Sequence, residues 1–322
     1  MKLSRIIALI LSITIIAFIF YKIGLEKLFS IFKNFNFSYL PLIIIILIFG
    51  YLLAGLNTWV ITKPFRKKTS LFYIIKATFI TLVYAAITPG KIADLLMIPF
   101  LKKQNLNLDQ AIIVVGFDKV ISLFVKIIFG LIGAIFIFKK IDFLYVGIPL
   151  ITFFVVILII LLISSKKFLN FIKNHLFRKY FIFFKKFSRD FKFYIKKNKK
   201  YIYYNTLITI IKNFFEALLF FVLFLAFGQL TNVLVIFFIF SLLSVIMLLT
   251  FPIGISGFGV RELFGIIVFG TVGVDAAIVF NSFILRIFLI YIINFFTIIF
   301  FREDLNFLKG SKIFKKIKFY KN

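Results

Sequence analysis

The sequence predicts an all-α protein that crosses a membrane several times. Of its 322 residues, 63% are hydrophobic and 51 are phenylalanine. A water-soluble domain of this length cannot bury so much apolar surface. The apolar residues fall into separate runs, and several of these approach the roughly 20 residues that a helix needs to span a bilayer. We therefore expect a polytopic integral membrane protein with about 8 transmembrane helices.

The charged residues narrow the function classes further. The formal net charge is +29, but the Lys and Arg residues lie largely between the apolar runs. There they set membrane topology and meet anionic headgroups, so nucleic acid is not an expected partner. The chain has no cysteine, a single histidine (His175) and 11 acidic residues. Disulfides, thiolate catalysis and Cys-ligated metals are excluded, and we expect neither a metal site nor a cofactor.

The first half, residues 1–164, contains five apolar runs. The basic N-terminus leads into the run Ile6–Tyr21, which we interpret as a retained span because no small-x-small cleavage site follows it. The other runs are Pro41–Ile61, Phe72–Leu101, Gln110–Phe138 and Phe143–Ile163. Asp109 is the expected N-cap of the fourth run.

The third run is interrupted by Thr88–Asp94, which contains Pro89 and Gly90. Proline removes a helical hydrogen bond and glycine favours other backbone conformations, so we expect the helix to break there.

Residues 165–201 form the one clearly non-spanning region. It holds thirteen Lys or Arg residues against the lone Asp190. Its apolar positions recur every three or four residues, which predicts an amphipathic helix on the cytoplasmic membrane surface. A solvated linker between two halves is the plain alternative, and a surface that binds a protein or nucleic acid is a less favoured one.

The second half, residues 202–302, repeats the plan of the first, and a basic tail follows at 303–322. Its apolar runs are Ile202–Phe227, Val233–Phe251, Leu263–Gly273 and Ala276–Phe301, the last with Asp275 as its expected N-cap. Pro252–Glu262 interrupts it with a proline and three glycines. Both halves therefore have a Pro/Gly break followed by a cation and an acid. Corresponding breaks in two halves indicate a transporter-like site at a repeat interface.

The basic clusters predict the orientation. The positive-inside rule puts both termini, Lys63–Lys68 and the 165–201 region in the cytoplasm. Seven uninterrupted runs alone would leave the two termini on opposite sides of the membrane. For both termini to lie in the cytoplasm, one broken segment should cross and the other should turn back. Keeping Lys102 and Lys103 on the side of Lys63–Lys68 makes the first broken segment the one that turns back. Lys139 and Lys140 then lie outside, which is a minor violation.

Charged residues at membrane depth are the candidates for function. A charge at the centre of a bilayer helix costs roughly 2.5–3.5 kcal/mol, so such groups pair or face water. If these residues have a function, they line a hydrated interior cavity. If they are only structural, they form ion pairs that hold helices together, or their side chains snorkel to the membrane surface. These residues are Asp94, Asp118, Glu216, Glu262, Lys91, Lys119, Lys126, Lys212, Arg261 and Arg286.

The spacing of some polar residues places them on shared helix faces. Asp118, Ser122 and Lys126 follow one another at four-residue intervals, and α-helical geometry puts such residues on one side. A longer polar stripe is formed by Asn205, Thr209, Lys212, Asn213 and Glu216.

The second break has two readings. Gly254, Gly257 and Gly259 can simply permit close helix packing, as small residues do in membranes. Alternatively, the amides from Gly259 to Glu262 begin a new helix and offer donors to an anionic headgroup, with help from Arg261. The substrate-binding residues that we predict are Pro89, Gly90, Lys91, Asp94, Asp118, Lys119, Glu216, Gly257, Gly259, Arg261, Glu262 and Arg286.

The two broken motifs, Thr88–Leu96 and Phe251–Glu262, resemble those of a known family. Asp118-Lys119 matches an acid-basic pair of that family, and Leu285-Arg286 with Tyr291 is similar to its last-span pattern. The family is the lysylphosphatidylglycerol synthetase transmembrane region, a flippase-like group of bacterial and archaeal membrane proteins. The resemblance covers nearly the whole chain.

The resemblance implies lipid translocation in the cell membrane of a bacterium or archaeon. Bifunctional members add a soluble aminoacyl-transferase domain, which we do not expect here because the chain ends soon after its last predicted span. Ala93-Asp94 stands where the family usually has Gly-Glu, so the acid is kept in a shorter form.

We expect a transporter-like protein that binds membrane lipids with anionic headgroups. One alternative is a membrane enzyme, or enzyme subunit, that acts on a lipid or polyprenyl-phosphate-linked substrate with a buried carboxylate as base. Another is an anchor for a separate soluble lipid-modifying enzyme. A second copy of the chain is also left open as a partner.

Overall fold

The structure is a computed structural model of the whole chain. It describes residues 2–65, 69–87, 90–137, 193–196, 198–249 and 258–304, and the single residues 147, 151 and 191. Within these ranges it is helical without strands, which confirms the predicted fold class. The helices are α1 (Lys2–Ile23), α2 (Leu25–Lys33), α3 (Leu40–Thr62), α4 (Leu71–Ile87), α5 (Met97–Lys103), α6 (Leu108–Ile137), α10 (Lys199–Ala226), α11 (Val233–Leu249), α12 (Val260–Gly270) and α13 (Ala276–Phe300), with the short 3-10 helices η1 (Phe37–Tyr39), η2 (Lys63–Phe65) and η3 (Gly90–Leu96).

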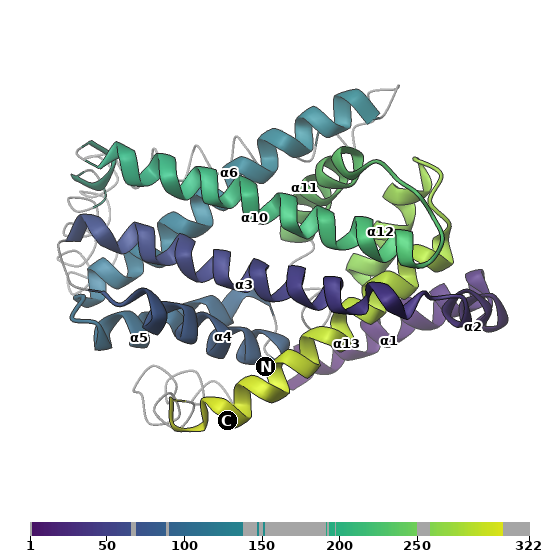
Figure 1. Cartoon of the computed structure of the whole chain (residues 1–322), viewed down its shortest axis with the longest axis horizontal. Helices are drawn as coiled ribbons and strands as arrows, with labels where there is room; N and C mark the ends of the chain where they lie inside the picture. The colour runs from purple at the N-terminus through teal and green to yellow at the C-terminus, as the bar shows by residue number, and fades with distance from the viewer. Residues whose placement is uncertain are drawn as a thin grey trace.

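Long helices from both halves lie side by side in the centre of the molecule (Figure 1). α10 packs along α3, and α11 packs along α6. In both pairs, a helix of the second half packs against a helix of the first half. Apolar side chains fill the spaces between them, including the fully buried rings of Phe220, Phe224 and Phe283. This interleaving brings polar residues of the two halves to a common interior.

Three helical stretches of the described residues are long and apolar enough to cross a membrane, namely Phe37–Phe65, Lys199–Ala226 and Ala276–Phe300. Shorter apolar helices occur at Ile10–Ile23, Leu71–Ala85 and Val233–Met247. Apart from residues 147 and 151, the predicted span 143–163 lies outside the described residues, as does most of the predicted surface helix at 165–201.

The first broken segment folds into a hairpin, which we call the first hairpin (α4, η3 and α5). The backbone N–H of Ser70, just before α4, donates a 2.9 Å hydrogen bond to Gln104 Oε1, just after α5. The chain therefore leaves and returns at the same end of the molecule. The prediction that this segment turns back is confirmed.

The second broken segment, α11 and α12, also returns to the end at which it begins. Gln229, just before α11, donates from Nε2 to the carbonyl of Gly273 at 2.8 Å, and its Oε1 accepts from the backbone N–H of Asp275 at 3.1 Å. We call this pair the second hairpin. A return to this end is also what two successive crossings require, first by Val233–Phe251 and then by the second broken segment, so the expectation that this segment crosses stays a prediction.

The two hairpins open at opposite ends of the molecule (Figure 1). The backbone N–H of Asn36, before α3, bonds the carbonyl of Ala226 at 2.8 Å, which places the start of α3 at the Gln229 end. At the other end of α3, Trp59 Nε1 donates to the carbonyl of Thr69 beside Ser70 at 2.9 Å. The hairpins thus enter the interior from opposite sides, which is the arrangement of an inverted repeat.

The start of α6 differs from the sequence prediction. The helix begins at Leu108, so Asp109 lies inside its first turn and is not the N-cap. Asn107 takes that place: its carbonyl accepts from Ala111, and its own N–H donates to Gln110 Oε1 at 3.1 Å. A glutamine that reaches back in this way is half of a capping box, and it outcompetes a cap at Asp109.

The α3–α4 crossing depends on a residue without a side chain. A Cβ on Gly55 would lie 2.7 Å from Ile75 Cγ1 and 2.8 Å from Ile75 Cα, so the α4 backbone would have to move. We expect Gly55→Ala to destabilise the protein by about 1–3 kcal/mol through overpacking. Gly50→Ala in the same helix is the matched control, because nothing lies within 4 Å of its added Cβ. Denaturation in detergent micelles should separate the two; equal stabilities would contradict this packing.

The Asp275 prediction is confirmed, because its side chain accepts from Ala277 N–H at 2.8 Å as the N-cap of α13. Lys27 Nζ of α2 also lies 2.7 Å from Asp275 Oδ2. Partial burial works against the charged form, but the bonds from Lys27 and from the Ala277 amide outweigh it and lower the pKa of Asp275.

Because the folded pKa of Asp275 is lowered, its charge stabilises the fold above the unfolded pKa of about 3.9, and this contribution is lost as pH falls through the folded value. Asp275→Asn keeps a good cap but loses the ion pair. We expect its small deficit in Tm at pH 7 to shrink as the pH falls below the unfolded pKa of about 3.9, in a thermal unfolding series over pH. A deficit that persists unchanged in acid would show that the ion pair is not its cause.

Candidate functional site

A polar stripe on α10 forms the axis of the candidate site. From Asn205 to Glu216 it extends roughly 16 Å along the helix. Two groups of polar residues from other helices meet it. The first, which we call the Asp118 junction, consists of Asn57, Asp94, Asp118, Lys119, Asn205 and Thr209. The second, which we call the Glu216 cluster, consists of Lys126, Asn213, Glu216, Arg261, Glu262 and Arg286.

The Asp118 junction joins α3, α6 and α10 through side-chain amides. Asn57 Nδ2 donates to Asp118 Oδ1 at 2.7 Å and to Thr209 Oγ1 at 3.0 Å. Asn205 Nδ2 donates to Asn57 Oδ1 at 2.6 Å and to the Asn57 carbonyl at 3.2 Å. Asn57, Asn205 and Thr209 are fully buried and Asp118 is 7% exposed. Most of these polar groups therefore satisfy one another in an apolar environment, and Asn205 Oδ1 is the buried atom of the junction without a partner among the described residues.

An ion pair connects this junction to the first hairpin. Lys119 Nζ lies 3.0 Å from Asp94 Oδ2, in η3, and 3.8 Å from Asp118 Oδ2. One ammonium group is thus shared by two carboxylates. Phe191 stacks on Phe117, the residue before Asp118, and the Tyr194 ring contacts Phe117 at a tilt of 31°.

In the Glu216 cluster, Arg286 of α13 pairs with Glu216 of α10. The distance from Arg286 Nη2 to Glu216 Oε1 is 2.8 Å, and the side chains are 17% and 34% exposed. The guanidinium also lies 6.0 Å from the centre of the Phe220 ring. Lys126, Lys212 and Arg261 add to the positive potential at Glu216. Cations therefore outnumber acids around this carboxylate.

At the start of α12, Glu262 organises the tip of the second hairpin. The side chain is fully buried: Oε2 accepts from Gly259 N–H at 2.6 Å, and Oε1 accepts from Arg261 Nη2 at 2.8 Å and Nε at 3.2 Å. This is the acidic half of a capping box, since glycine has no side chain to complete it. Gly259 has φ of 88°, and a Cβ there would lie 3.1 Å from the carbonyl oxygen of Ser12 in α1. Glycine is thus required both by the turn and by the approach of α1.

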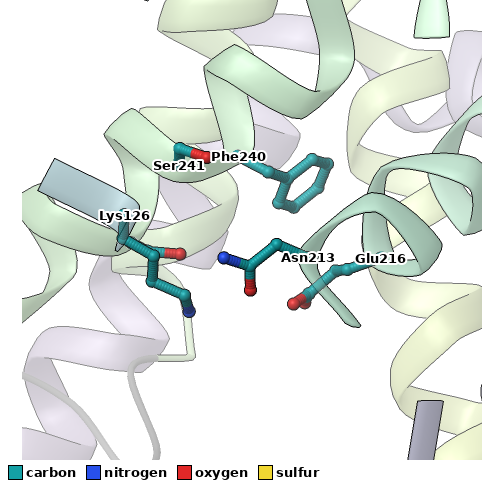
Figure 2. Close-up of a pocket in the computed structure, with 6 residues that line it drawn as sticks. Lys126, Asn213, Glu216, Phe240 and Ser241 are labelled. Atoms are coloured by element: carbon teal, nitrogen blue, oxygen red, sulfur yellow. The ribbon is translucent and has the colours of Figure 1, made fainter. Parts of the chain in front are cut away.

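A small pocket with room for roughly one water molecule lies between the α10 stripe, α6 and α11. Its walls are Lys126, Asn213, Glu216, Phe240, Ser241 and Ser244. Figure 2 shows the Asn213 amide between the Lys126 side chain and the Glu216 carboxylate. Asn213 Nδ2 is buried and has no hydrogen-bond acceptor among the described residues. The pocket therefore offers a donor beside a carboxylate and a lysine.

The structure brings most of the predicted site residues together, in two groups. Asp94, Asp118 and Lys119 meet in the first group, and Glu216, Arg261, Glu262 and Arg286 contribute to the second. Gly90 and Lys91 belong to η3 and Gly259 caps α12. Pro89 and Gly257 lie outside the described residues, as does the Lys91 side chain.

Sequence reasoning missed Asn57, the residue that binds the junction together. Its signal was present as a lone amide inside the apolar run Pro41–Ile61. Lys126 and Asn213 were recognised as polar positions on helix faces, but were not among the predicted site residues. Ser241 and Ser244 of α11 gave no signal beyond being small polar residues in an apolar helix.

The chemistry open to this arrangement is the binding of charged groups. Among the described residues, no three His, Asp or Glu side chains gather to hold a metal ion. The Glu262 carboxylate is fully engaged, while Glu216, Arg286 and Lys119 keep part of their surface exposed. Partly exposed charges can exchange one partner for a charged ligand at low cost, because water screens exposed ion pairs and they contribute little stability.

Comparison with known proteins agrees with the resemblance of the motifs. The family model for the lysylphosphatidylglycerol synthase TM region matches residues 5–298. Neither the curated proteins nor the solved structures contain a match. The match spans both hairpins and every helix of the two polar groups. The chain therefore belongs to the lysylphosphatidylglycerol synthase transmembrane-region family.

Proposed function

We propose that the protein moves the headgroup of an anionic lipid between the two leaflets of a membrane. Its family comprises membrane proteins that act on lipids, and the translocation step is our proposal. The observation that carries it is the pair of inverted hairpins whose tips bring charges to one polar stripe. Substrate sites of transporters are commonly built where broken helices of two repeats meet near the bilayer midplane.

The Glu216 cluster supports a negative charge on the headgroup. Four cationic side chains interact electrostatically with Glu216, namely Arg286, Lys126, Arg261 and Lys212. Arginine suits phosphate recognition because its guanidinium can donate two parallel hydrogen bonds. A phosphate that approaches Arg286 would share it with Glu216, while the lipid tails stay in the surrounding hydrocarbon.

The pocket in the present structure is too small for a headgroup, so the helices around it must move during transport. α11, which carries Ser241 and Ser244, is one arm of the second hairpin. Movement of this hairpin relative to α10 would enlarge the pocket. Inverted hairpins that open at opposite ends supply such moving elements on both sides.

The enzyme alternative needs a carboxylate that can act as a base. Glu262 is a buried carboxylate of the site, but both its oxygens accept hydrogen bonds. These contacts support a structural role for Glu262 and so favour translocation over lipid modification at this residue.

The test is reconstitution in liposomes with fluorescent phosphatidylglycerol and phosphatidylethanolamine, followed by dithionite quenching of the outer leaflet. We expect protein-dependent exchange that is faster for the anionic lipid. Lys126→Gln, in the pocket wall, should slow it several-fold, whereas Lys33→Gln on the exposed surface of α2 should not. Exchange equal to that of protein-free vesicles for every lipid would overturn the proposal.

Two further readouts of the same vesicles address the alternatives. Chemical turnover of the lipid would favour the enzyme. Co-purification of a soluble lipid-modifying enzyme that is lost on deletion of residues 165–201 would favour an anchoring role.

A further inference from the structure

We propose that Lys212 is a second phosphate-binding residue, to which Arg286 passes the lipid headgroup along α10. The inference rests on the proposed translocation, because it adds a position on the path of that process. Lys212 is a charged residue at membrane depth, and none of the contacts described above assigns it a role. A charge inside a membrane protein usually pairs with another charge or lines the path of a substrate.

Lys212 lies within the polar stripe of α10. With 3.6 residues per turn, its side chain leaves the helix within about 60° of those of Thr209 and Glu216. Along the axis it is roughly 6 Å from Glu216 and roughly 10 Å from Asn205. The side chain is partly buried. Lys212 therefore lies between the Glu216 cluster and the Asp118 junction.

The charge of Lys212 interacts with both of these groups. The carboxylates of Asp94 and Asp118 act on it from the junction, and that of Glu216 acts on it from the other side. Glu216 in turn interacts with both Lys212 and Arg286. A phosphate that is bound at Arg286 therefore has a second cation within electrostatic reach, in the direction of the first hairpin.

Lys212 forms no ion pair and no hydrogen bond with another described residue. The junction carboxylates are contacted by Lys119 instead, at 3.0 and 3.8 Å, and the charge of Lys119 repels Lys212. Glu216 pairs with Arg286, although Lys212 precedes it by four residues on the same helix. A lysine on the N-terminal side of a glutamate at this spacing is the weaker order of such a pair. Lys212 is thus a cation in need of a direct counter-ion, which a phosphate group can supply.

Two more donors near Glu216 have no acceptor within the part of the chain that the structure describes. They are Asn213 Nδ2 and Arg286 Nε, and both atoms are buried. Asn213 follows Lys212 directly, and its amide lies beside the Glu216 carboxylate (Figure 2). Phosphate oxygens are strong acceptors that bind several donors at once. The surplus of donors on either side of Glu216 therefore suits a phosphate group.

The two cations differ in how they hold a phosphate. The planar guanidinium of Arg286 can donate two parallel hydrogen bonds, whereas the ammonium of Lys212 is a compact charge on a flexible stem. The nearby carboxylates of Asp94 and Asp118 weaken the hold of Lys212 further, which favours release of the headgroup. In both positions the phosphate has a cationic partner, so its charge is not left uncompensated in the interior.

The first test uses the absence of cysteine from the chain. Lys212→Cys should slow exchange of fluorescent phosphatidylglycerol in liposomes at least tenfold, because a thiol offers the phosphate no positive charge. Reaction with 2-aminoethyl methanethiosulfonate, which attaches an ammonium group, should restore most of the exchange. Methyl methanethiosulfonate, which attaches an uncharged group, should not. Lys199→Cys, at the exposed start of α10, is the matched control and should exchange like wild type throughout.

A second test measures contact with the headgroup. The thiol of Lys212→Cys should react with the uncharged reagent several-fold more slowly in vesicles that contain phosphatidylglycerol than in vesicles of phosphatidylcholine alone. The thiol of Lys199→Cys should react equally fast in both. Equal rates for Lys212→Cys would overturn the proposal and leave Lys212 as a distant counter-charge for Asp94 and Asp118.

The outcomes separate this proposal from translocation itself. Exchange by Lys212→Cys that equals wild type, or that recovers equally with the uncharged reagent, would reject Lys212 as a phosphate ligand and leave translocation intact. Protection of the thiol by phosphatidylglycerol without any exchange by wild type would support the phosphate position and reject translocation. If Lys212→Cys does not fold or its thiol does not react, Lys212→Gln and Lys212→Arg replace it, and only the arginine variant should keep exchange.

Discussion

Glu262→Ala is expected to destabilise the protein by about 3–5 kcal/mol, the usual cost of removing one partner from a buried ion pair. Glu262 is fully buried and holds both the Arg261 guanidinium and the N–H of Gly259. Alanine leaves the cation and the amide without this partner at the start of α12. Denaturant titration in micelles measures the loss.

Two variants make this expectation specific. Glu262→Gln should fall between wild type and alanine, because a glutamine oxygen still accepts from Gly259 but does not balance the charge of Arg261. Glu26→Ala, at an exposed acid of α2, should change stability by no more than about 0.5 kcal/mol. A Glu262→Ala protein as stable as Glu26→Ala would show that the tip of the second hairpin does not depend on this pair.

The helices and the breaks between them could be predicted from local sequence. Apolar runs such as Pro41–Ile61 have the length of a span, and Pro/Gly segments cannot continue a helix. The spacing of Asn205, Thr209 and Glu216 likewise predicted one polar stripe, which the structure uses in both polar groups. These features depend on neighbours within one helix, and such information is present in the local pattern.

The contacts that close the second hairpin could not be predicted in this way. The run Val233–Phe251 is long enough to cross a membrane by itself, and hydropathy does not distinguish a span from one arm of a hairpin. The deciding contacts join Gln229 to Gly273 and Asp275, 44 and 46 residues further along the chain. Gln104 has the same role in the first hairpin through Ser70.

Asn57 illustrates the same limit within the site. The sequence shows an amide in an apolar helix, which must find partners, but it does not say which. The partners Asp118 and Asn205 lie 61 and 148 residues away. Only the packing of α3 between α6 and α10 brings them together.

The sequence analysis did not predict the α2 helix, for a different reason. Its nine residues are too few to give an apolar run.

The second large effect is expected at the Glu216–Arg286 pair. Arg286→Gln should reduce lipid exchange at least tenfold and destabilise the protein by about 2–3 kcal/mol, because a carboxylate loses its partner inside the membrane. The double variant Glu216→Gln/Arg286→Gln removes both charges. It should recover most of the lost stability, since replacing a whole buried pair costs little.

Lipid exchange should not recover in that double variant, and this separation distinguishes a binding role from a structural one. If Arg286 only held α13 to α10, restoring stability would restore exchange. If it binds the phosphate, as we propose, neither glutamine can replace its charge. Liposome exchange and denaturation measured on the same preparations give a double-mutant cycle for each property. Parallel recovery of both properties would reject Arg286 as a headgroup ligand.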